Sequence, residues 1–163
     1  MLILNSGGTL NKRYDVRDGN LEVPFDSIAI NKILKSVESK YDLAGVVFKD
    51  SLDFDLEDRK MITNIIMESK DSSFLIIHGT DSMHETAEFL DEIFDDRRIV
   101  LTGAMKPYEI DNTEASFNVG MAMGFLKAKP KNGVYICMNG HVKQWQRLVK
   151  NKSVGKFEVV KQS

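Results

Sequence analysis

The amino-acid sequence predicts a doubly wound α/β fold, in which a mostly parallel sheet carries helices on both faces as a three-layer α/β/α arrangement. Short apolar runs alternate with longer segments in which apolar residues recur at helical spacing. This alternation is typical of βαβ crossovers. The runs are apolar throughout rather than at every second position, which indicates strands that are buried on both faces.

The apolar runs are the predicted strands. They cover Leu2–Leu4, Leu43–Phe48, Phe74–Ile77, Ile99–Leu101 and Val134–Met138, and we expect a late additional strand at Phe157–Val160. Helices are predicted between them, at Ser27–Tyr41, Leu56–Lys70, Ser82–Phe94 and Glu114–Lys127. Asp55 is the expected N-cap of the second helix, and Ser82 to Glu85 have the spacing of a capping box for the third. The fourth helix is rich in Ala, Gly and Met, so we expect it to pack closely on the sheet.

The composition fits one soluble domain over residues 1–163. Hydrophobic residues make up 42% and charged residues 28%, a balance that requires neither disulfides nor a structural metal. The single cysteine, Cys137, lies in an apolar run and is expected to be a buried thiol in a reducing compartment. A net charge of −2 without a large cluster of Lys and Arg argues against nucleic-acid binding. No apolar stretch approaches the ~18 residues of a membrane-spanning helix and no signal-peptide pattern starts the chain, so we expect a cytoplasmic protein without membrane contact.

Polar loops follow every predicted strand of the parallel sheet. Ligands of open α/β sheets bind beyond the carboxyl ends of the strands, so these loops are the expected place of a functional site. They are Asn5–Thr9, Lys49–Asp53, His78–Ser82, Thr102–Pro107 and Asn139–His141. Their shared wealth of hydroxyl and carboxylate groups favours a functional site over five ordinary turns.

Two other kinds of site find little support. The turn at Gly7 and Gly8 has neither the G-x-G-x-x-G spacing of dinucleotide-binding folds nor the pattern of a P-loop. His78, His84 and His141 lie in separate segments without the paired spacing of metal ligands. We therefore expect neither a cofactor nor a metal, and we interpret His78 as a hydrogen-bonded structural histidine at the end of a buried strand.

Motifs in these loops resemble the signatures of the L-asparaginase family. Ser6–Thr9 resembles the first signature, Thr-Gly-Gly-Thr, and His78–Ala87 closely resembles the second, His-Gly-Thr-Asp-Thr-Met-Glu-Glu-Thr-Ala. Gly103–Pro107 is similar to the family's Gly-Ala-Met-Arg-Pro, and Phe117–Asn118 falls where its Phe-Asn pair follows. The resemblance spans nearly the whole chain but only the N-terminal half of the family's usual architecture. It implies a single asparaginase N-terminal-like domain without the C-terminal domain.

The resemblance assigns roles to five residues of a threonine amidohydrolase. Thr9 corresponds to the nucleophile, and Tyr14, in a polar segment that suits a closing lid, corresponds to the tyrosine that accepts or relays its proton. Thr80, Asp81 and Lys150 correspond to the family's second constellation. Because a neighbouring carboxylate favours the charged form of a lysine, we expect Lys150 to orient Thr80 and a water molecule, with action as a base as the alternative.

The resemblance also implies how an amino-acid substrate is held. Ser51 corresponds to the serine that binds the α-carboxylate, and Asp81 is the natural partner of the α-ammonium group. Backbone N–H groups of the turns at Gly8 and Gly79 are expected to bind the carboxylate or the oxyanion. Leu52 stands where the family usually has glutamine, which predicts a weaker grip on the substrate.

Together these features predict the hydrolysis of L-asparagine to L-aspartate and ammonia. Within the same class, the alternative is a related amide hydrolase, either a glutaminase or an ammonia-supplying amidotransferase subunit. A non-catalytic amino-acid-binding relic is the alternative from another class. We also expect a homo-oligomer, a dimer or larger, with Trp145 either at its interface or covering the domain's own core.

Overall fold

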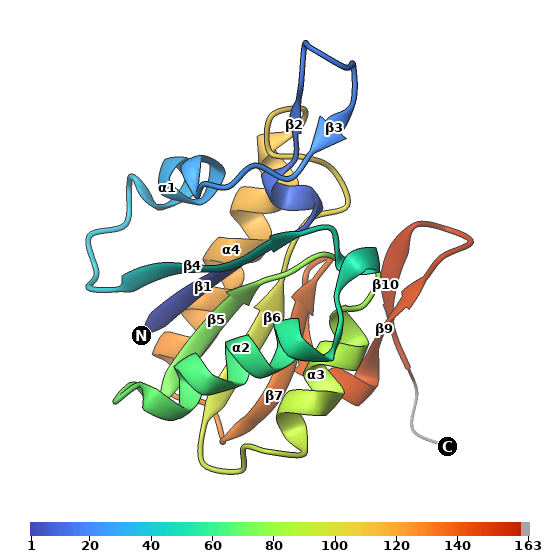
Figure 1. Ribbon diagram of the computed structural model, residues 1–163. Coiled ribbons are helices and arrows are strands. Elements are labelled where there is room, and N and C mark those ends of the chain that lie inside the picture. The colour runs from blue at the N-terminus through green and yellow to red at the C-terminus, as the bar shows by residue number, and fades with distance from the viewer. Residues whose placement is uncertain (161–163) are drawn as a thin grey trace.

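The computed structural model describes residues 1–160 and contains a central six-stranded sheet (Figure 1). Its strands follow the order β4-β1-β5-β6-β7-β8. They are β1 (Leu2–Gly7), β4 (Asp42–Lys49), β5 (Ser73–Ile77), β6 (Arg98–Thr102), β7 (Gly133–Met138) and β8 (His141–Gln144). The strands β4, β1, β5, β6 and β7 run parallel, whereas β8 returns antiparallel to β7.

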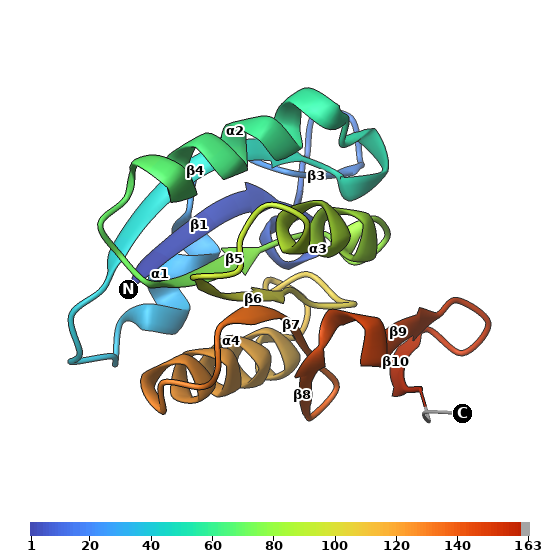
Figure 2. The same cartoon turned by 90° about the horizontal axis from the view of Figure 1, so that it is seen from below.

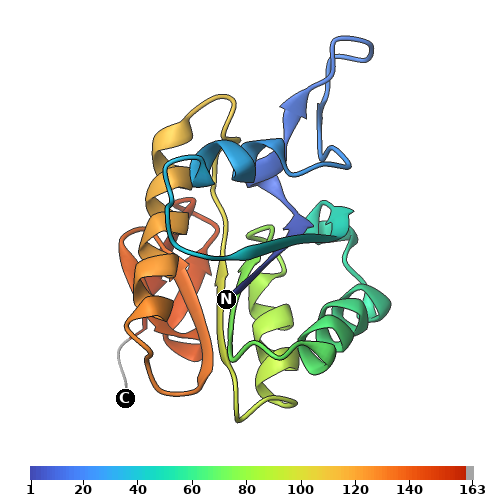
Figure 3. The same cartoon turned by 90° about the vertical axis from the view of Figure 1, so that its left-hand side faces the viewer.

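Helices cover both faces of this sheet (Figures 2 and 3). On one face, α1 (Ile28–Leu34) and α4 (Asn112–Lys127) contribute to one hydrophobic cluster; on the other, α2 (Leu56–Glu68) and α3 (Met83–Asp91) contribute to a second. The predicted three-layer, doubly wound α/β fold is thereby confirmed. Within residues 1–160, no helix has the length and apolar character needed to cross a membrane.

Strand β5 shows why the predicted strands are continuous apolar runs. Phe74 and Ile76 pack into the cluster beneath α2 and α3, whereas Leu75 and Ile77 pack into the cluster beneath α1 and α4. Successive side chains of a strand point to opposite faces, so a sheet that is covered on both sides needs an apolar residue at every position.

The predicted helix boundaries are correct in part. Asp55 caps α2 in a reciprocal capping box, since its carboxylate accepts the Asp58 N–H at 3.0 Å and the Asp58 carboxylate accepts the Asp55 N–H at 3.0 Å. The capping box predicted at Ser82 was wrong, because the Ser82 hydroxyl donates to the Ser51 carbonyl instead. The extension of the first helix to Tyr41 was also wrong, as α1 ends at Leu34.

Several short elements lie at the carboxyl edge of the sheet. The hairpin of β2 (Arg13–Tyr14) and β3 (Leu21–Glu22) projects from the body of the molecule (Figure 1). Strands β9 (Leu148–Asn151) and β10 (Lys156–Val159) pair with each other, so the predicted late strand exists but does not join the main sheet. Three single-turn 3₁₀ helices are η1 (Thr9–Asn11), η2 (Ser51–Asp53) and η3 (Trp145–Arg147).

Candidate active site

The strand order creates a crevice between two neighbouring strands. The chain leaves β1 toward α1 on one face of the sheet and leaves β5 toward α3 on the opposite face. The carboxyl ends of β1 and β5 therefore form a topological switch point, where open α/β sheets bind their ligands. Thr9 follows β1 and Thr80 follows β5, so two predicted site residues flank this point.

Glycines let the turns after these strands touch. Gly8 has φ +76°, and a Cβ at this position would lie 2.4 Å from the Gly79 backbone nitrogen. A Cβ on Gly79 would lie 2.5 Å from the Cβ and Oγ of Ser51, in the turn after β4. Any side chain at either glycine would push the turns apart. The turns that carry Thr9 and Thr80 are thus in direct backbone contact, and the Ser51 side chain packs against Gly79.

Lys150 reaches this place from β9, near the end of the chain. Its Nζ donates to Thr80 Oγ1 at 2.8 Å and to Asp81 Oδ1 at 2.8 Å. Only 14% of the Lys150 side chain and 30% of the Asp81 side chain are exposed, and Thr80 is buried. Charge-assisted hydrogen bonds in such a shielded place are stronger than those at an open surface, so they fix the three side chains as one group.

Ser51 adjoins this group, and within residues 1–160 its hydroxyl accepts a hydrogen bond without donating one. Its Oγ accepts the Asp81 N–H at 3.1 Å. A serine hydroxyl has one O–H donor in addition to its acceptor lone pairs. The Ser51 proton is therefore available for an anionic group of a ligand, and the same hydrogen bond anchors the backbone of Asp81.

Thr9 and Tyr14 lie differently. Thr9 is half-buried and begins the short helix η1, directly after the left-handed Gly8. Tyr14 is 56% exposed on the projecting hairpin, where it pairs with Leu21. Among the hydrogen bonds of residues 1–160, none joins these two side chains. The structure thus brings together four predicted residues (Ser51, Thr80, Asp81 and Lys150) with the turn of Thr9, and leaves Tyr14 outside.

Two supports of the Thr9 turn were missed from the sequence. The side-chain oxygen of buried Asn5 accepts hydrogen bonds from the Gly7 N–H and from Asn11 Nδ2, both at 3.0 Å. Lys12 forms an ion pair of 2.5 Å with Asp50, which precedes Ser51. Asn5 carried a readable signal, since a polar residue that interrupts a buried strand needs internal partners. The ion pair carried none, because both residues look like ordinary surface charges.

The electrostatics of Asp50 reflect its partners. Burial by itself raises the pKa of this carboxyl, but the hydrogen bonds from Lys12 and the Leu52 N–H, with the charge of Lys150, hold it below the ordinary 3.8. An ionised Asp50 maintains the ion pair at neutral pH. The contact ties the chain after Thr9 to the turn that carries Ser51.

His78 is fully buried and hydrogen-bonded through both ring nitrogens, which agrees with the structural interpretation from the sequence. Over residues 1–160, no group of three His, Cys, Asp or Glu side chains is arranged to hold a metal ion. Trp145 covers the domain's own core: it packs against the cluster beneath α2 and α3, and its Nε1 donates to Asp91 at 2.9 Å.

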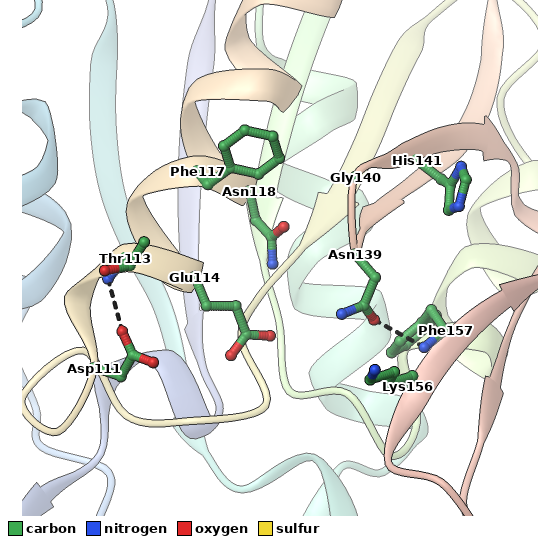
Figure 4. Close-up of a pocket in the computed structure, with 10 residues that line it drawn as sticks. All are labelled: Asp111, Thr113, Glu114, Phe117, Asn118, Asn139, Gly140, His141, Lys156 and Phe157. Carbon is green, nitrogen blue, oxygen red and sulfur yellow. Dashed lines mark hydrogen bonds between the residues drawn. The ribbon is translucent and has the colours of Figure 1, made fainter.

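A separate pocket of about 680 Å³ lies between the first turns of α4, the turn after β7 and the start of β10 (Figure 4). Phe117 and Asn118 of α4 face it from one side, and Asn139 and Phe157 face it from the other. Its ten lining residues include the polar loop Asn139–His141 but none of the residues predicted to act in catalysis or substrate binding. Ser51, Thr80, Asp81 and Lys150 instead gather at the switch point, which is the candidate active site.

Several known proteins are similar to this chain in sequence. Residues 1–161 match the family model described as asparaginase, N-terminal. L-asparaginase 2 of Escherichia coli (strain K12) is 30% identical over 152 residues, which cover 86% of this chain and 43% of that protein. A glutamyl-tRNA(Gln) amidotransferase subunit of Methanococcus maripaludis (strain C5) is 29% identical over 147 residues, covering 85% of this chain and 34% of that protein.

Solved structures show the same fold. The thermostable L-asparaginase from Thermococcus kodakarensis superimposes with a TM-score of 0.85 at 23% identity, covering 99% of this chain and 51% of that one. A probable cytoplasmic L-asparaginase from Campylobacter jejuni gives a TM-score of 0.76 at 26% identity, covering 97% and 52%. The chain thus spans about half the length of these structures, and less than half of the relatives matched by sequence. Its match over residues 1–161 shows that the chain belongs to the asparaginase family, as a counterpart of the N-terminal domain.

Proposed function

We propose that this chain hydrolyses L-asparagine to L-aspartate and ammonia, with Thr9 as the nucleophile. The observation that carries the proposal is that Lys150 of β9 is hydrogen-bonded to Thr80 and Asp81, and that the turn of these two residues touches the turn of Thr9. A carboxamide resists attack, so its hydrolysis needs an activated nucleophile and donors for the developing oxyanion. The switch point offers the Thr9 hydroxyl for the first role and the backbone N–H groups of the two turns for the second.

In the first step, Thr9 Oγ1 attacks the carboxamide carbon. The C–N bond breaks, the nitrogen leaves as ammonia after gaining the threonine proton, and an ester to Thr9 remains. Backbone N–H groups of the turns at Gly8 and Gly79 stabilise the oxyanion. Tyr14 relays the proton if the hairpin of β2 and β3 closes over the substrate, a motion that its exposed position allows.

In the second step, water hydrolyses the ester. Lys150 donates to Thr80 Oγ1, so the hydroxyl proton of Thr80 points elsewhere and is free to orient the attacking water. The ion pair with Asp81 holds Lys150 in place. We therefore propose that Lys150 acts mainly by orienting Thr80, as the sequence suggested.

The substrate's charged groups find complementary partners. The Asp81 carboxylate is 30% exposed and can accept an α-ammonium group, and the free Ser51 proton can bind an α-carboxylate. Leu52 is 73% exposed beside Ser51 and offers no polar contact. We expect a correspondingly weak apparent affinity for the amino acid.

A second candidate function is supported by one group of relatives. Several proteins that match this chain are subunits of a glutamyl-tRNA(Gln) amidotransferase, and another is a glutaminase-asparaginase from Acinetobacter glutaminasificans. Hydrolysis of glutamine, or ammonia supply to a partner enzyme, would use the same residues.

We also propose that the protein is cytoplasmic and forms a homo-oligomer. Light scattering that shows only monomers would contradict the oligomer.

The test is ammonia release from L-asparagine, L-glutamine and D-asparagine by the wild type and by Thr9→Val, Thr80→Val and Lys150→Met. Loss of a nucleophile or of a positioned proton-transfer group costs at least ~100-fold in rate, so we expect all three variants to collapse while remaining folded. Lys152→Met is the matched control, because Lys152 is exposed in the β9–β10 turn. Faster turnover of glutamine would favour the second candidate. A wild type that binds amino acids but releases no ammonia would show a non-catalytic relic.

A further inference from the structure

A chain of hydrogen bonds supports the Gly79–Thr80 peptide from behind. Arg59 Nε donates to Thr86 Oγ1 at 3.2 Å, and Thr86 Oγ1 lies 2.9 Å from His78 Nε2. His78 Nδ1 lies 2.8 Å from the Gly79 carbonyl oxygen. This series of hydrogen bonds starts on α2, passes through α3 and ends at the turn that carries Thr80.

The partners fix the protonation of the ring. A carbonyl oxygen only accepts hydrogen bonds, so His78 Nδ1 carries the proton that it shares with Gly79. With the proton of a neutral ring on Nδ1, His78 Nε2 has only a lone pair, so the Thr86 hydroxyl donates to it while accepting from Arg59. His78 is thus a neutral imidazole in the Nδ1–H form.

Burial favours the same neutral state. His78 has no exposed surface and its ring lies 4.5 Å from the ring of Phe54, centroid to centroid. Burial lowers the pKa of His78 from 6.5 to about 4, the hydrogen bond to Gly79 opposes this shift, and the charge of Arg59 adds to it. The His78 ring therefore stays neutral at the near-neutral pH values at which amide hydrolysis is measured.

The supported peptide is one that would otherwise rotate easily. Gly79 must lack a side chain because Ser51 occupies that space, and glycine has the least restricted backbone of all residues. The peptide bond is planar and trans, so fixing the Gly79 carbonyl against His78 also directs the Thr80 N–H to the opposite side, away from the ring. A rotated peptide would present a carbonyl oxygen where a donor is needed.

We propose that His78 is a positioning residue that, through its Nδ1–H, holds the Gly79–Thr80 peptide in the orientation that the Thr80 chemistry requires. The Gly79 carbonyl selects the tautomer that can do this, and Thr86, which accepts from Arg59, donates to the other ring nitrogen. The catalytic part of the proposal rests on the proposed amide hydrolysis; the tautomer and the peptide orientation do not.

Two substitutions separate the two ring nitrogens. The amide nitrogen of asparagine can take the place of Nδ1, so His78→Asn keeps the donor to Gly79 and loses the contact with Thr86. Glutamine reaches the position of Nε2, so His78→Gln keeps a group beside Thr86 and loses the donor to Gly79. We expect kcat to fall by ~100-fold in His78→Gln, because small misplacements of reacting groups cost this much, and by less than ~10-fold in His78→Asn. KM should change much less than kcat, and the exposed His141→Asn is the control.

Nuclear magnetic resonance supplies a readout that is independent of turnover. The two-bond ¹H–¹⁵N pattern of His78 in the wild type should be that of the Nδ1–H tautomer, and the Thr80 amide resonance should move more in His78→Gln than in His78→Asn. An Nε2–H tautomer, or equal losses of kcat in both variants at equal folded fraction, would overturn the proposal. If the wild type releases no ammonia, the proposed function fails, and the tautomer with the Thr80 resonance alone decides whether His78 holds the peptide.

Discussion

The buried His78 predicts a specific loss of stability in mild acid. The pKa of this ring is lowered to about 4 in the folded protein, chiefly by burial, whereas an unfolded histidine titrates near 6.5. Between these values the unfolded chain binds a proton that the folded chain does not, so the free energy of unfolding falls as the pH drops through this window. Each pKa unit corresponds to ~1.4 kcal/mol, which gives a loss of about 2 kcal/mol at pH 5 and about 3 kcal/mol at pH 4.

The assay is urea denaturation of the wild type and of His78→Asn at several pH values between 7.5 and 4.5. Asparagine does not titrate, so the difference between the two curves isolates His78. Burial also lowers the pKa of His84, and this group destabilises both proteins alike. Carboxyls with lowered pKa, such as Asp50 and Asp55, lose their contribution to stability only at more acidic pH. This loss is the same in both proteins and cancels in the difference. If the difference in the free energy of unfolding between the two proteins stays constant down to pH 4.5, the reasoning is refuted. That result would show that protonating His78 does not destabilise the folded protein.

Two further outcomes follow from local contacts. Asp55→Ala should lower the free energy of unfolding by ~1 kcal/mol, because it removes one half of the capping box with Asp58; urea denaturation measures this, with Asp53→Ala as the control. Cys137 should not react with a thiol reagent at pH 8 until the protein is unfolded in urea, because it is fully buried and burial raises its pKa to about 12 against the opposing hydrogen bond of Thr102. Rapid labelling of the native protein would contradict that burial.

The sheet could be predicted because its signal is local. A strand such as β5, with four consecutive apolar residues after Ser73, has few alternatives once helices flank it on both sides in the sequence. Strand β8 was missed although its signal was present. Asn139 and Gly140 have φ +50° and +79°, and an Asn-Gly pair of this kind is the strongest short-range sign of a hairpin. Those two residues were interpreted only as polar groups at a strand end.

The site could be predicted only in part from local pattern. The turns of Thr9 and Thr80 follow apolar strands, and the rule for open α/β sheets places both at one edge. Lys150 lies 69 residues from Asp81 in the sequence, and only the family resemblance singled it out from its neighbouring lysines. The contact between Lys12 and Asp50 had no such support, since a surface charge does not reveal its partner before the fold is known.

The geometry of this site is set by backbone packing before any catalytic side chain is considered. A Cβ on Gly8 would meet Gly79, and a Cβ on Gly103 would lie 2.3 Å from the His78 carbonyl oxygen, so the turns after β1, β5 and β6 close on one another without intervening side chains. The hydroxyls of Thr9 and Thr80 each directly follow one of these glycines, and their separation is therefore inherited from the contact between the turns. Glycine gives this closeness at the cost of backbone freedom. Two contacts restrict that freedom to one arrangement. His78 holds the Gly79 carbonyl, and Lys150 donates to Thr80 Oγ1.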